Sequence, residues 1–270
     1  PMIKENQRIL AFLHLANNES LQRYLIEKKA TALAYECVEK KDGTLPLLLP
    51  MSEVAGRLVV MQACTFLQKQ YGGNGQLLGG VSGVESGHIV IIGAGVAGKA
   101  AVKMATGLGT KVTVLDTDLD KLRALDDLYQ GRIETISSNQ TNIGKAVRNA
   151  DVVISAILKS GEKSSIIITE SMVRNMKPGS VSMDVSVDQG ASVETIDRTT
   201  TYDDPVFEKY GVLHYAVTNI PGATPYTSTY ALANATLSYV VAIADHGIQE
   251  AMAKNPSLEK GVVIYNGKIQ

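Results

Sequence analysis

The sequence contains no tryptophan, and aromatic residues make up only 5% of it. Proteins that bind single-stranded nucleic acid need aromatic side chains on which the bases stack. The formal net charge is −1, so no electrostatic attraction draws the chain to nucleic acid or to an anionic membrane surface. We therefore expect neither of these partners.

Long apolar runs and cysteines are equally scarce. No stretch reaches the roughly 18 uninterrupted apolar residues of a membrane span. Residues 1–9 carry charges and asparagine where a signal peptide would have an apolar core. The two cysteines, Cys37 and Cys64, are too few for a disulfide framework. We expect two buried, reduced thiols in a cytoplasmic protein.

What remains is an ordinary globular composition, with 45% hydrophobic and 20% charged residues. The length of 270 residues is enough for one large domain or two.

Between residues 89 and 217, short apolar runs alternate with helical patterns. The predicted strands are 88–92, 111–115, 132–136, 151–156 and 180–187, and the predicted helices are 96–108, 119–128, 143–149 and 170–176. This alternation predicts an α/β fold with a Rossmann-type, doubly wound parallel sheet and right-handed crossovers.

The two ends of the chain follow a different pattern, with strands expected at 8–15 and 32–38, a helix at 20–28 and a hairpin turn at Asn266-Gly267. A long helix is predicted from Ser52, as its N-cap, to about residue 69, and another over 228–245, closed by Gly247. We expect a nucleotide-binding domain, residues 47–221. It would be inserted in a second, smaller α/β substrate domain made of residues 1–46 and 222–270.

A glycine-rich motif opens the helix after the first predicted strand of the sheet. Gly93 would permit a tight turn, Gly95 would let the backbone approach a pyrophosphate, and Gly98 would let helix and strand pack closely. The free N–H groups near Val96 and Ala97 would then face the phosphates. By itself the motif is weak evidence, but here it lies between a strand and a helix, as a dinucleotide site requires.

An acidic residue ends the next predicted strand. The carboxylate of Asp116 would accept hydrogen bonds from the ribose hydroxyls and would repel a 2′-phosphate, which favours NAD over NADP. The alternative is a cluster of packing glycines with a surface aspartate. Lys121 could lie against the adenosine or could be a solvated helix lysine.

Two further residues are candidates for chemistry. Asp188 follows the predicted strand 180–187 and would face the nicotinamide as a base or electrostatic partner, or else cap a turn. His14 lies in an apolar run, where a histidine is either a hydrogen-bonded core residue or a proton-transfer group. Asp184 is interpreted as structural. No cysteine or histidine spacing indicates zinc, and neither a nucleophile elbow nor a P-loop is present.

Beyond these motifs, the chain resembles the alanine dehydrogenases, which share ancestry with the NAD-binding subunit of proton-translocating transhydrogenase. The resemblance covers nearly the whole chain. It is carried by residues 12–16 (FLHLA), 47–57 (LLLPMSEVAGR), 78–83 (LGGVSG), 112–116 (VTVLD), 187–190 (VDQG) and 227–232 (TSTYAL).

The resemblance implies roles for particular residues. His14 and Asp188 match the family's catalytic histidine and aspartate. The positions that match NAD contacts are Ser52, Val96, Ala97, Asp116, Lys121, Ser138, Ile157, Leu158, Asp188, Arg198, Val217 and Asn219. The implied reaction is the reversible oxidative deamination of L-alanine with NAD to pyruvate and ammonium. His14 would hydrogen-bond the substrate oxygen and handle a carbinolamine proton, and Asp188 would activate water or stabilise an iminium charge.

The resemblance also implies a preceding segment of roughly eighty residues, about half a typical domain, whose Arg and Lys hold the substrate carboxylate. No residue here matches either role. Because each lost charge-assisted hydrogen bond costs about 1.5–3 kcal/mol, we expect this chain to bind NADH but to turn over poorly. The extra residue in 194–199 weakens the match of Arg198.

Two other interpretations remain. The chain could be part of a transhydrogenase NAD subunit, a partner of a membrane proton pump, or an NAD(H)-binding module without catalysis. The family usually forms hexamers through long linking helices, and the predicted helices 52–69 and 228–245 correspond to these. A homo-oligomer is therefore expected.

Overall fold

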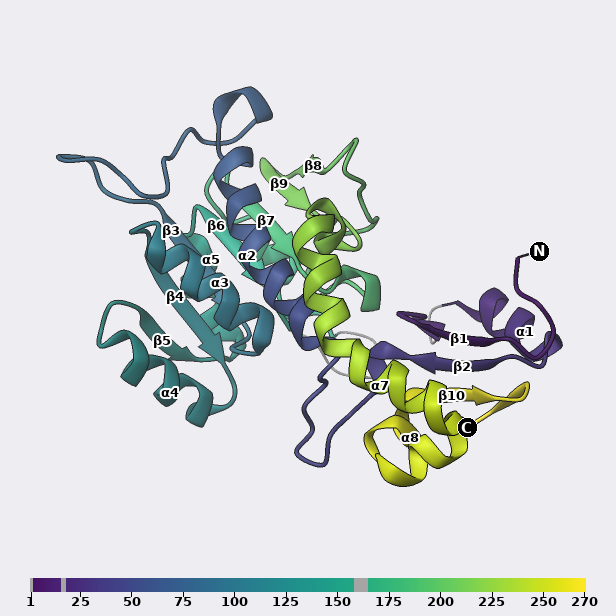
Figure 1. Ribbon diagram of the computed structural model, residues 1–270. Coiled ribbons are helices and arrows are strands. Elements are labelled where there is room, and N and C mark those ends of the chain that lie inside the picture. Colours follow the sequence, from purple (N-terminus) through teal and green to yellow (C-terminus); the bar gives the residue numbers. More distant parts are fainter. Residues whose placement is uncertain (1, 16–17, 158–164) are drawn as a thin grey trace. The chain divides into compact units, whose positions relative to one another are not determined.

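The structure is a computed structural model that describes residues 2–15, 18–157 and 165–270. The described residues form two compact units (Figure 1). One consists of the chain up to Met51 and from Pro225 onward, and the other lies between Ser52 and Thr224. The boundaries expected from the sequence, after residues 46 and 221, lie a few residues earlier. No helix of the described chain is long and apolar enough to cross a membrane.

The middle unit contains a seven-stranded sheet in the order β5-β4-β3-β6-β7-β9-β8. Neighbouring strands are parallel except for the edge strand β8, which runs antiparallel to β9. This confirms the predicted doubly wound α/β fold. The strands are β3 (His88–Ile92), β4 (Lys111–Asp116), β5 (Glu134–Ser137), β6 (Val152–Ser155), β7 (Val181–Asp184), β8 (Val206–Lys209) and β9 (Val212–Tyr215).

Each face of this sheet has its own hydrophobic core, because successive side chains of a strand point to opposite faces. In β3, Ile89 and Ile91 belong to one core and Val90 and Ile92 to the other. The helices that contribute to the first core are α2 (Leu49–Phe66), α3 (Val96–Gly107) and α4 (Leu119–Tyr129), and those of the second are α5 (Gln140–Arg148) and α6 (Glu170–Val173). A strand buried on both sides explains why β3 is apolar throughout.

The unit made from the chain ends has a four-stranded sheet in the order β1-β2-β10-β11. Strand β1 is parallel to β2, and β10 is antiparallel to both β2 and β11. The predicted hairpin turn joins β10 to β11, with positive φ angles of 47° and 76° at Asn266 and Gly267. The elements are β1 (Arg8–Ala11), α1 (Glu19–Glu27), β2 (Thr31–Ala34), α7 (Pro225–Lys254), α8 (Ser257–Gly261), β10 (Val262–Tyr265) and β11 (Lys268–Ile269).

Several element boundaries differ from the sequence-based expectation. Helix α2 begins at Leu49, so Ser52 lies within its first turn and the predicted N-cap was wrong. Pro50 fits there because the first helical N–H groups need no intrahelical acceptor. The predicted strand 180–187 ends at Asp184, and a 3₁₀ turn spans Val187–Gln189. Helix α7 continues past the expected stop but has a non-helical break at Gly247, with φ 75°.

The β8–β9 hairpin and helix α8 were not predicted. The hairpin turn uses Tyr210 and Gly211, both with positive φ, of 57° and 74°. Such turns are recognised in a sequence by an Asn-Gly pair. Tyrosine rarely adopts a positive φ, so Tyr-Gly does not indicate a turn of this kind. Helix α8 has only 5 residues, too few to display a helical repeat.

At the end of the large sheet where its parallel strands begin, one buried carboxylate, that of Asp151, binds three separate segments. Asp151 is 5% exposed. Its Oδ1 accepts hydrogen bonds from Asn74 Nδ2 at 3.1 Å and Lys177 Nζ at 2.9 Å. Its Oδ2 accepts the backbone N–H of His88 at 2.9 Å. One side chain thereby connects the start of β3 to the segments that precede β3 and β7.

Replacing Asp151 with alanine should therefore destabilise the middle unit by about 3 kcal/mol, because the half-buried Asn74 amide, an ammonium group and a backbone N–H lose their acceptor. Urea unfolding followed by circular dichroism measures this loss. Asp127→Ala, at an exposed position of α4, is the control and should change stability by less than about 0.5 kcal/mol. Equal midpoints for the two variants would contradict the assigned role of Asp151.

Candidate functional site

The candidate residues of the middle unit gather mainly where its parallel strands end. Chain order reverses between β3 and β6, which are neighbours in the sheet although β4 and β5 intervene in the sequence. Ligands of open parallel sheets bind at such a switch point, beyond the carboxyl ends of the strands. The residues that follow strand ends here are Gly93, Gly95, Val96, Ala97, Gly98, Asp116, Ser138, Ile157, Asp188, Val217 and Asn219.

The three glycines of the motif, two in the loop after β3 and one in α3, differ in the space around them. Gly93 has φ 106°, and a Cβ added to it would lie 2.6 Å from the carbonyl oxygen of Ala156, at the end of β6. A Cβ on Gly98 would overlap the carbonyl oxygen of Gly93. A Cβ on Gly95 would meet no atom within 4 Å, so this is where the backbone is open to a ligand.

Helix α3 begins at this open position. Its N-cap, Gly95, has no side chain to accept hydrogen bonds from the first turn, and no side-chain cap bond forms. Val96 is 39% exposed. The uncapped N–H groups of this turn carry the positive end of the helix dipole, which suits a phosphate group.

Asp116, at the end of β4, is bonded directly to the glycine loop. Its Oδ2 accepts the N–H of Ala94 at 2.6 Å and its Oδ1 accepts the N–H of Asp118 at 2.8 Å. Each carboxylate oxygen has a further lone pair, so the half-buried group can also accept from ribose hydroxyls. Asp116 therefore shapes the loop, and its remaining lone pairs are what the predicted ribose contact would need.

Two other candidates lie close to Asp116 in the structure. The N–H of Ser138, which follows β5, donates to the Asp116 carbonyl oxygen at 2.9 Å. Lys121 lies in the first turn of α4, where its Nζ is 3.5 Å from Asp118 Oδ2, with both side chains nearly half exposed. The structure thus gives Lys121 an acidic partner at the N-cap of its own helix.

Asp188 lies in a short loop after β7 that a buried carboxylate closes. Asp184 Oδ1 accepts the N–H of Ser186 at 3.0 Å, and Asp184 Oδ2 accepts both the N–H and the Oγ–H of Ser192 at 2.7 Å. Burial raises the pKa of Asp184, although these hydrogen bonds act in the opposite direction. The interpretation of Asp184 as structural is confirmed, and its structural task is to hold both ends of the loop that carries the half-buried Asp188.

The remaining candidates of this unit are less closely gathered. Ile157 follows β6, and its side chain would lie 3.2 Å from a Cβ on Gly93. Val217 is buried, whereas Asn219 is exposed with φ 53°. Arg198 is exposed; its guanidinium lies 4.1 Å from the centre of the Phe207 ring and 3.4 Å from Asp197. Leu158 lies outside the described residues.

Ser52 is placed by a helix contact that the sequence did not reveal. It lies four residues before Gly56 and therefore on the same face of α2. A Cβ on Gly56 would overlap the carbonyl oxygen of Ala97 in the first turn of α3. Glycine at position 56 thus lets α2 approach the start of α3 and brings the Ser52 face toward it.

His14 belongs to the other unit, just past the end of β1. Its backbone has φ 45°, which is uncommon for a residue with a side chain. Its N–H donates to Glu36 Oε1 at 2.7 Å, and its ring is stacked at 14° on Phe12 with 6.2 Å between ring centres. The predicted strand 8–15 ends at Ala11, so His14 lies in a turn and not in an apolar strand.

The other histidines have structural surroundings. His88 Nε2 is 2.8 Å from Thr113 Oγ1. His214 is fully buried, with Nε2 2.7 Å from Thr195 Oγ1. Burial lowers the pKa of His214 to about 4, so it stays neutral near pH 7. His246 Nδ1 lies 3.7 Å from Glu250 Oε1 on the surface of α7.

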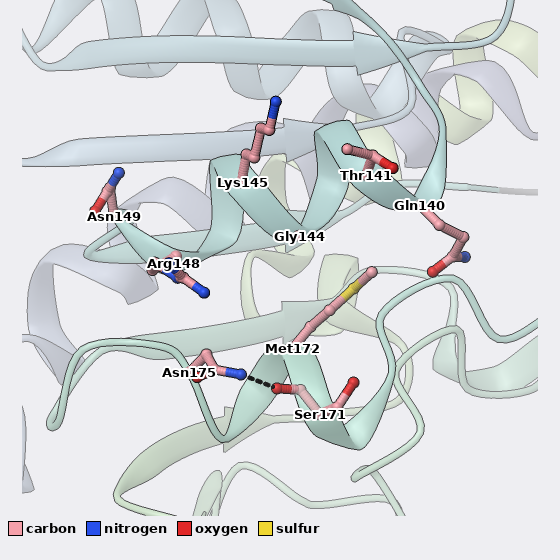
Figure 2. A pocket seen from close by; sticks show the side chains of 9 residues that line it. All are labelled: Gln140, Thr141, Gly144, Lys145, Arg148, Asn149, Ser171, Met172 and Asn175. Atoms are coloured by element: carbon pink, nitrogen blue, oxygen red, sulfur yellow. Dashed lines mark hydrogen bonds between the residues drawn. The ribbon is translucent and has the colours of Figure 1, made fainter.

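A hollow of about 660 Å³ lies elsewhere on the middle unit, between α5 and α6 (Figure 2). Most of the residues that line it are of polar types, and they include Lys145, Arg148, Asn149 and Asn175. None of the predicted site residues lines it. The candidate site is therefore defined by the strand ends and the glycine loop, not by this hollow.

Comparison with known proteins accounts for both units. The domain profiles described as "Alanine dehydrogenase/PNT, N-terminal domain" and "Alanine dehydrogenase/PNT, C-terminal domain" match residues 1–55 and 59–270. An alanine dehydrogenase from Methanococcus maripaludis is 49% identical over 268 residues, which are 99% of this chain and 72% of that protein. Alanine dehydrogenase 2 from Staphylococcus aureus is also 49% identical, over 269 residues, 100% of this chain and 72% of that protein.

Solved structures give the same result. An L-alanine dehydrogenase superposes with a TM-score of 0.93 at 43% identity, covering 99% of this chain and 73% of that one. A transhydrogenase from Sinorhizobium meliloti superposes with a TM-score of 0.82 at 20% identity, covering 99% and 76%. The second likeness shows a shared fold.

The close approach at Gly98 generates a prediction about dinucleotide binding. In Gly98→Val the added side chain would overlap the Gly93 carbonyl, so the loop or α3 must shift. We expect NADH to bind at least about tenfold more weakly, a change of roughly 1.4 kcal/mol. Titration of NADH fluorescence measures the dissociation constant. Gly107→Val, in the same helix with no atom within 4 Å, is the matched control, and equal affinities of the two variants would refute the assigned role of the glycine.

Proposed function

The chain belongs to the alanine dehydrogenase/PNT family, and we propose that it catalyses the NAD-dependent, reversible oxidative deamination of L-alanine. The overall reaction converts L-alanine, NAD⁺ and water to pyruvate, ammonium, NADH and a proton. The observation that carries this proposal is 49% identity to alanine dehydrogenases over nearly the whole chain. The transhydrogenase likeness, at 20% identity, gives no comparable support for that activity.

The residues of the middle unit fit a dinucleotide. The open side of Gly95 and the uncapped first turn of α3 would receive the pyrophosphate. Asp116 would accept from the ribose hydroxyls of NAD and, being negative, would repel the extra phosphate of NADP. When bound, the cofactor supplies the hydride acceptor for the α-carbon of alanine, and the protein supplies orientation and proton transfer.

The proton-transfer roles are assigned to His14 and Asp188. An imidazole can exchange protons near neutral pH, so His14 would hydrogen-bond the substrate oxygen and accept or return the carbinolamine proton. Asp188 would activate the attacking water or stabilise the positive iminium nitrogen. We also propose a cytoplasmic location, since Cys37 and Cys64 are free thiols.

This function is tested by following NADH oxidation with pyruvate and ammonium, omitting each in turn and repeating with NADPH. We expect oxidation that needs both substrates and strongly prefers NADH. His14→Asn should lower kcat by about 10²–10⁴-fold, the usual contribution of a general acid or base, with NADH binding unchanged. His246→Asn, at the surface pair with Glu250, is the control and should retain activity. Oxidation that does not require ammonium would rule out the proposed reaction.

We further propose that the chain assembles as a homo-oligomer, up to the hexamer implied by the family resemblance. Helix α7 carries an exposed apolar stripe of Tyr226, Tyr230, Leu237 and Val241, which are 79%, 62%, 64% and 46% exposed. Spacings of four and seven residues place them on one helix face. Such a stripe is typical of a surface that packs against another copy.

Sedimentation velocity tests this assembly. Leu237→Glu should shift the oligomer toward smaller species, because a carboxylate would have to be buried in an apolar contact. Leu128→Glu on α4 is the matched control, since Leu128 is a leucine of nearly equal exposure, 66%, in the other unit. A monomeric wild type, or an unchanged oligomer in Leu237→Glu, would contradict a role for this stripe.

A further inference from the structure

The ladder between β1 and β2 stops before it reaches His14. The last paired residues are Ala11 and Ala34. Just beyond them, the N–H groups of Leu13 and His14 point to a side chain instead of a strand. Glu36 Oε1 accepts from Leu13 N at 3.2 Å and from His14 N at 2.7 Å, and Oε2 lies 3.3 Å from Leu13 N. A carboxylate therefore replaces the backbone acceptors that a longer strand would have offered.

This substitution allows His14 to leave the extended conformation. At φ 45° the backbone of His14 is left-handed, a conformation that is strained for a residue with a Cβ. Hydrogen bonds to an ionised acceptor are about twice as strong as neutral ones. The two hydrogen bonds to Glu36 oppose this strain, and they orient the Cα–Cβ bond from which the imidazole projects.

Two aromatic rings support the same turn. The Phe12 ring is stacked with the His14 ring and meets the Tyr35 ring edge-on, at 85° with 5.5 Å between centres. Tyr35 and Glu36 are consecutive residues of the 3₁₀ turn Tyr35–Cys37 that follows β2. This 3₁₀ turn therefore holds His14 in two ways. The Glu36 carboxylate binds its backbone N–H, and Tyr35 packs against Phe12, whose ring is stacked with the imidazole.

We propose that Glu36 is a positioning residue for His14, which fixes the left-handed turn and so aims the imidazole at the substrate. The inference rests on the proposed function, in which His14 transfers the proton. In this role Glu36 holds the backbone of His14 and takes no part in the proton transfer.

The test compares Glu36→Ala and Glu36→Gln with Glu39→Ala in the pyruvate and ammonium assay. Glu39 is the matched control, because its carboxylate lies in the same segment but pairs with Lys260 at 2.7 Å. We expect Glu36→Ala to lower kcat by about 10- to 100-fold, as misplacement of a catalytic group does. Glu36→Gln, which keeps a neutral oxygen acceptor, should lie between Glu36→Ala and wild type. NADH affinity should stay unchanged in all three variants, since every predicted nucleotide contact among the described residues belongs to the middle unit.

Hydrogen exchange read by mass spectrometry separates this proposal from the proposed function. The Leu13 and His14 amides should exchange faster in Glu36→Ala and at the wild-type rate in Glu39→Ala, whether or not the protein oxidises NADH. An inactive wild type with faster exchange in Glu36→Ala would refute the alanine reaction and support the role of Glu36 in holding His14. Three results for Glu36→Ala would each overturn the positioning role. They are wild-type exchange of the two amides, a wild-type kcat where the wild type is active, and a loss of NADH affinity as large as the loss of kcat.

Discussion

The structure depends throughout on carboxylates that accept backbone N–H groups at the ends of strands. Asp116 binds the N–H of Ala94, Asp184 binds those of Ser186 and Ser192, and Glu36 binds those of Leu13 and His14. Where a strand ends, its next N–H groups lose their ladder partners and must find another acceptor. A charged acceptor supplies that partner while leaving the loop free to take a shape that neither a helix nor a sheet would permit.

These hydrogen bonds fix the shape of loops that carry candidate site residues. Asp184 holds the segment between Ser186 and Ser192, so Asp188 lies in a loop closed at both ends. Each oxygen of Asp116 uses one lone pair on a backbone N–H and keeps another, which is the acceptor that the proposed nucleotide contact requires. Removing such a carboxylate therefore changes the shape of a loop as well as its charge, and its effect on activity cannot be read from charge alone.

The sequence predicts those parts of the molecule that repeat locally. The apolar strand β3, the glycine loop and the helix after it follow from periodicity and from a motif whose spacing has a steric cause. The β8–β9 hairpin was missed because Tyr210-Gly211 is an unusual turn pair. The tasks of Glu36 and Asp184 depend on side chains that bind backbone 22 and 8 residues away. No local sequence pattern predicts such a hydrogen bond. From the sequence alone, Glu36 cannot be distinguished from other surface carboxylates.

Each unit prepares its candidate residues with contacts of its own. The bonds that shape the glycine loop and the Asp188 loop lie between residues 93 and 192, all in the middle unit, whereas His14 is held by Phe12, Tyr35 and Glu36 of the other unit. The loops that carry the candidate nucleotide contacts and Asp188 therefore rest on one set of interactions, and His14 rests on another. It follows that a substitution can disturb the surroundings of His14 and leave the glycine loop and the Asp188 loop intact, or the reverse.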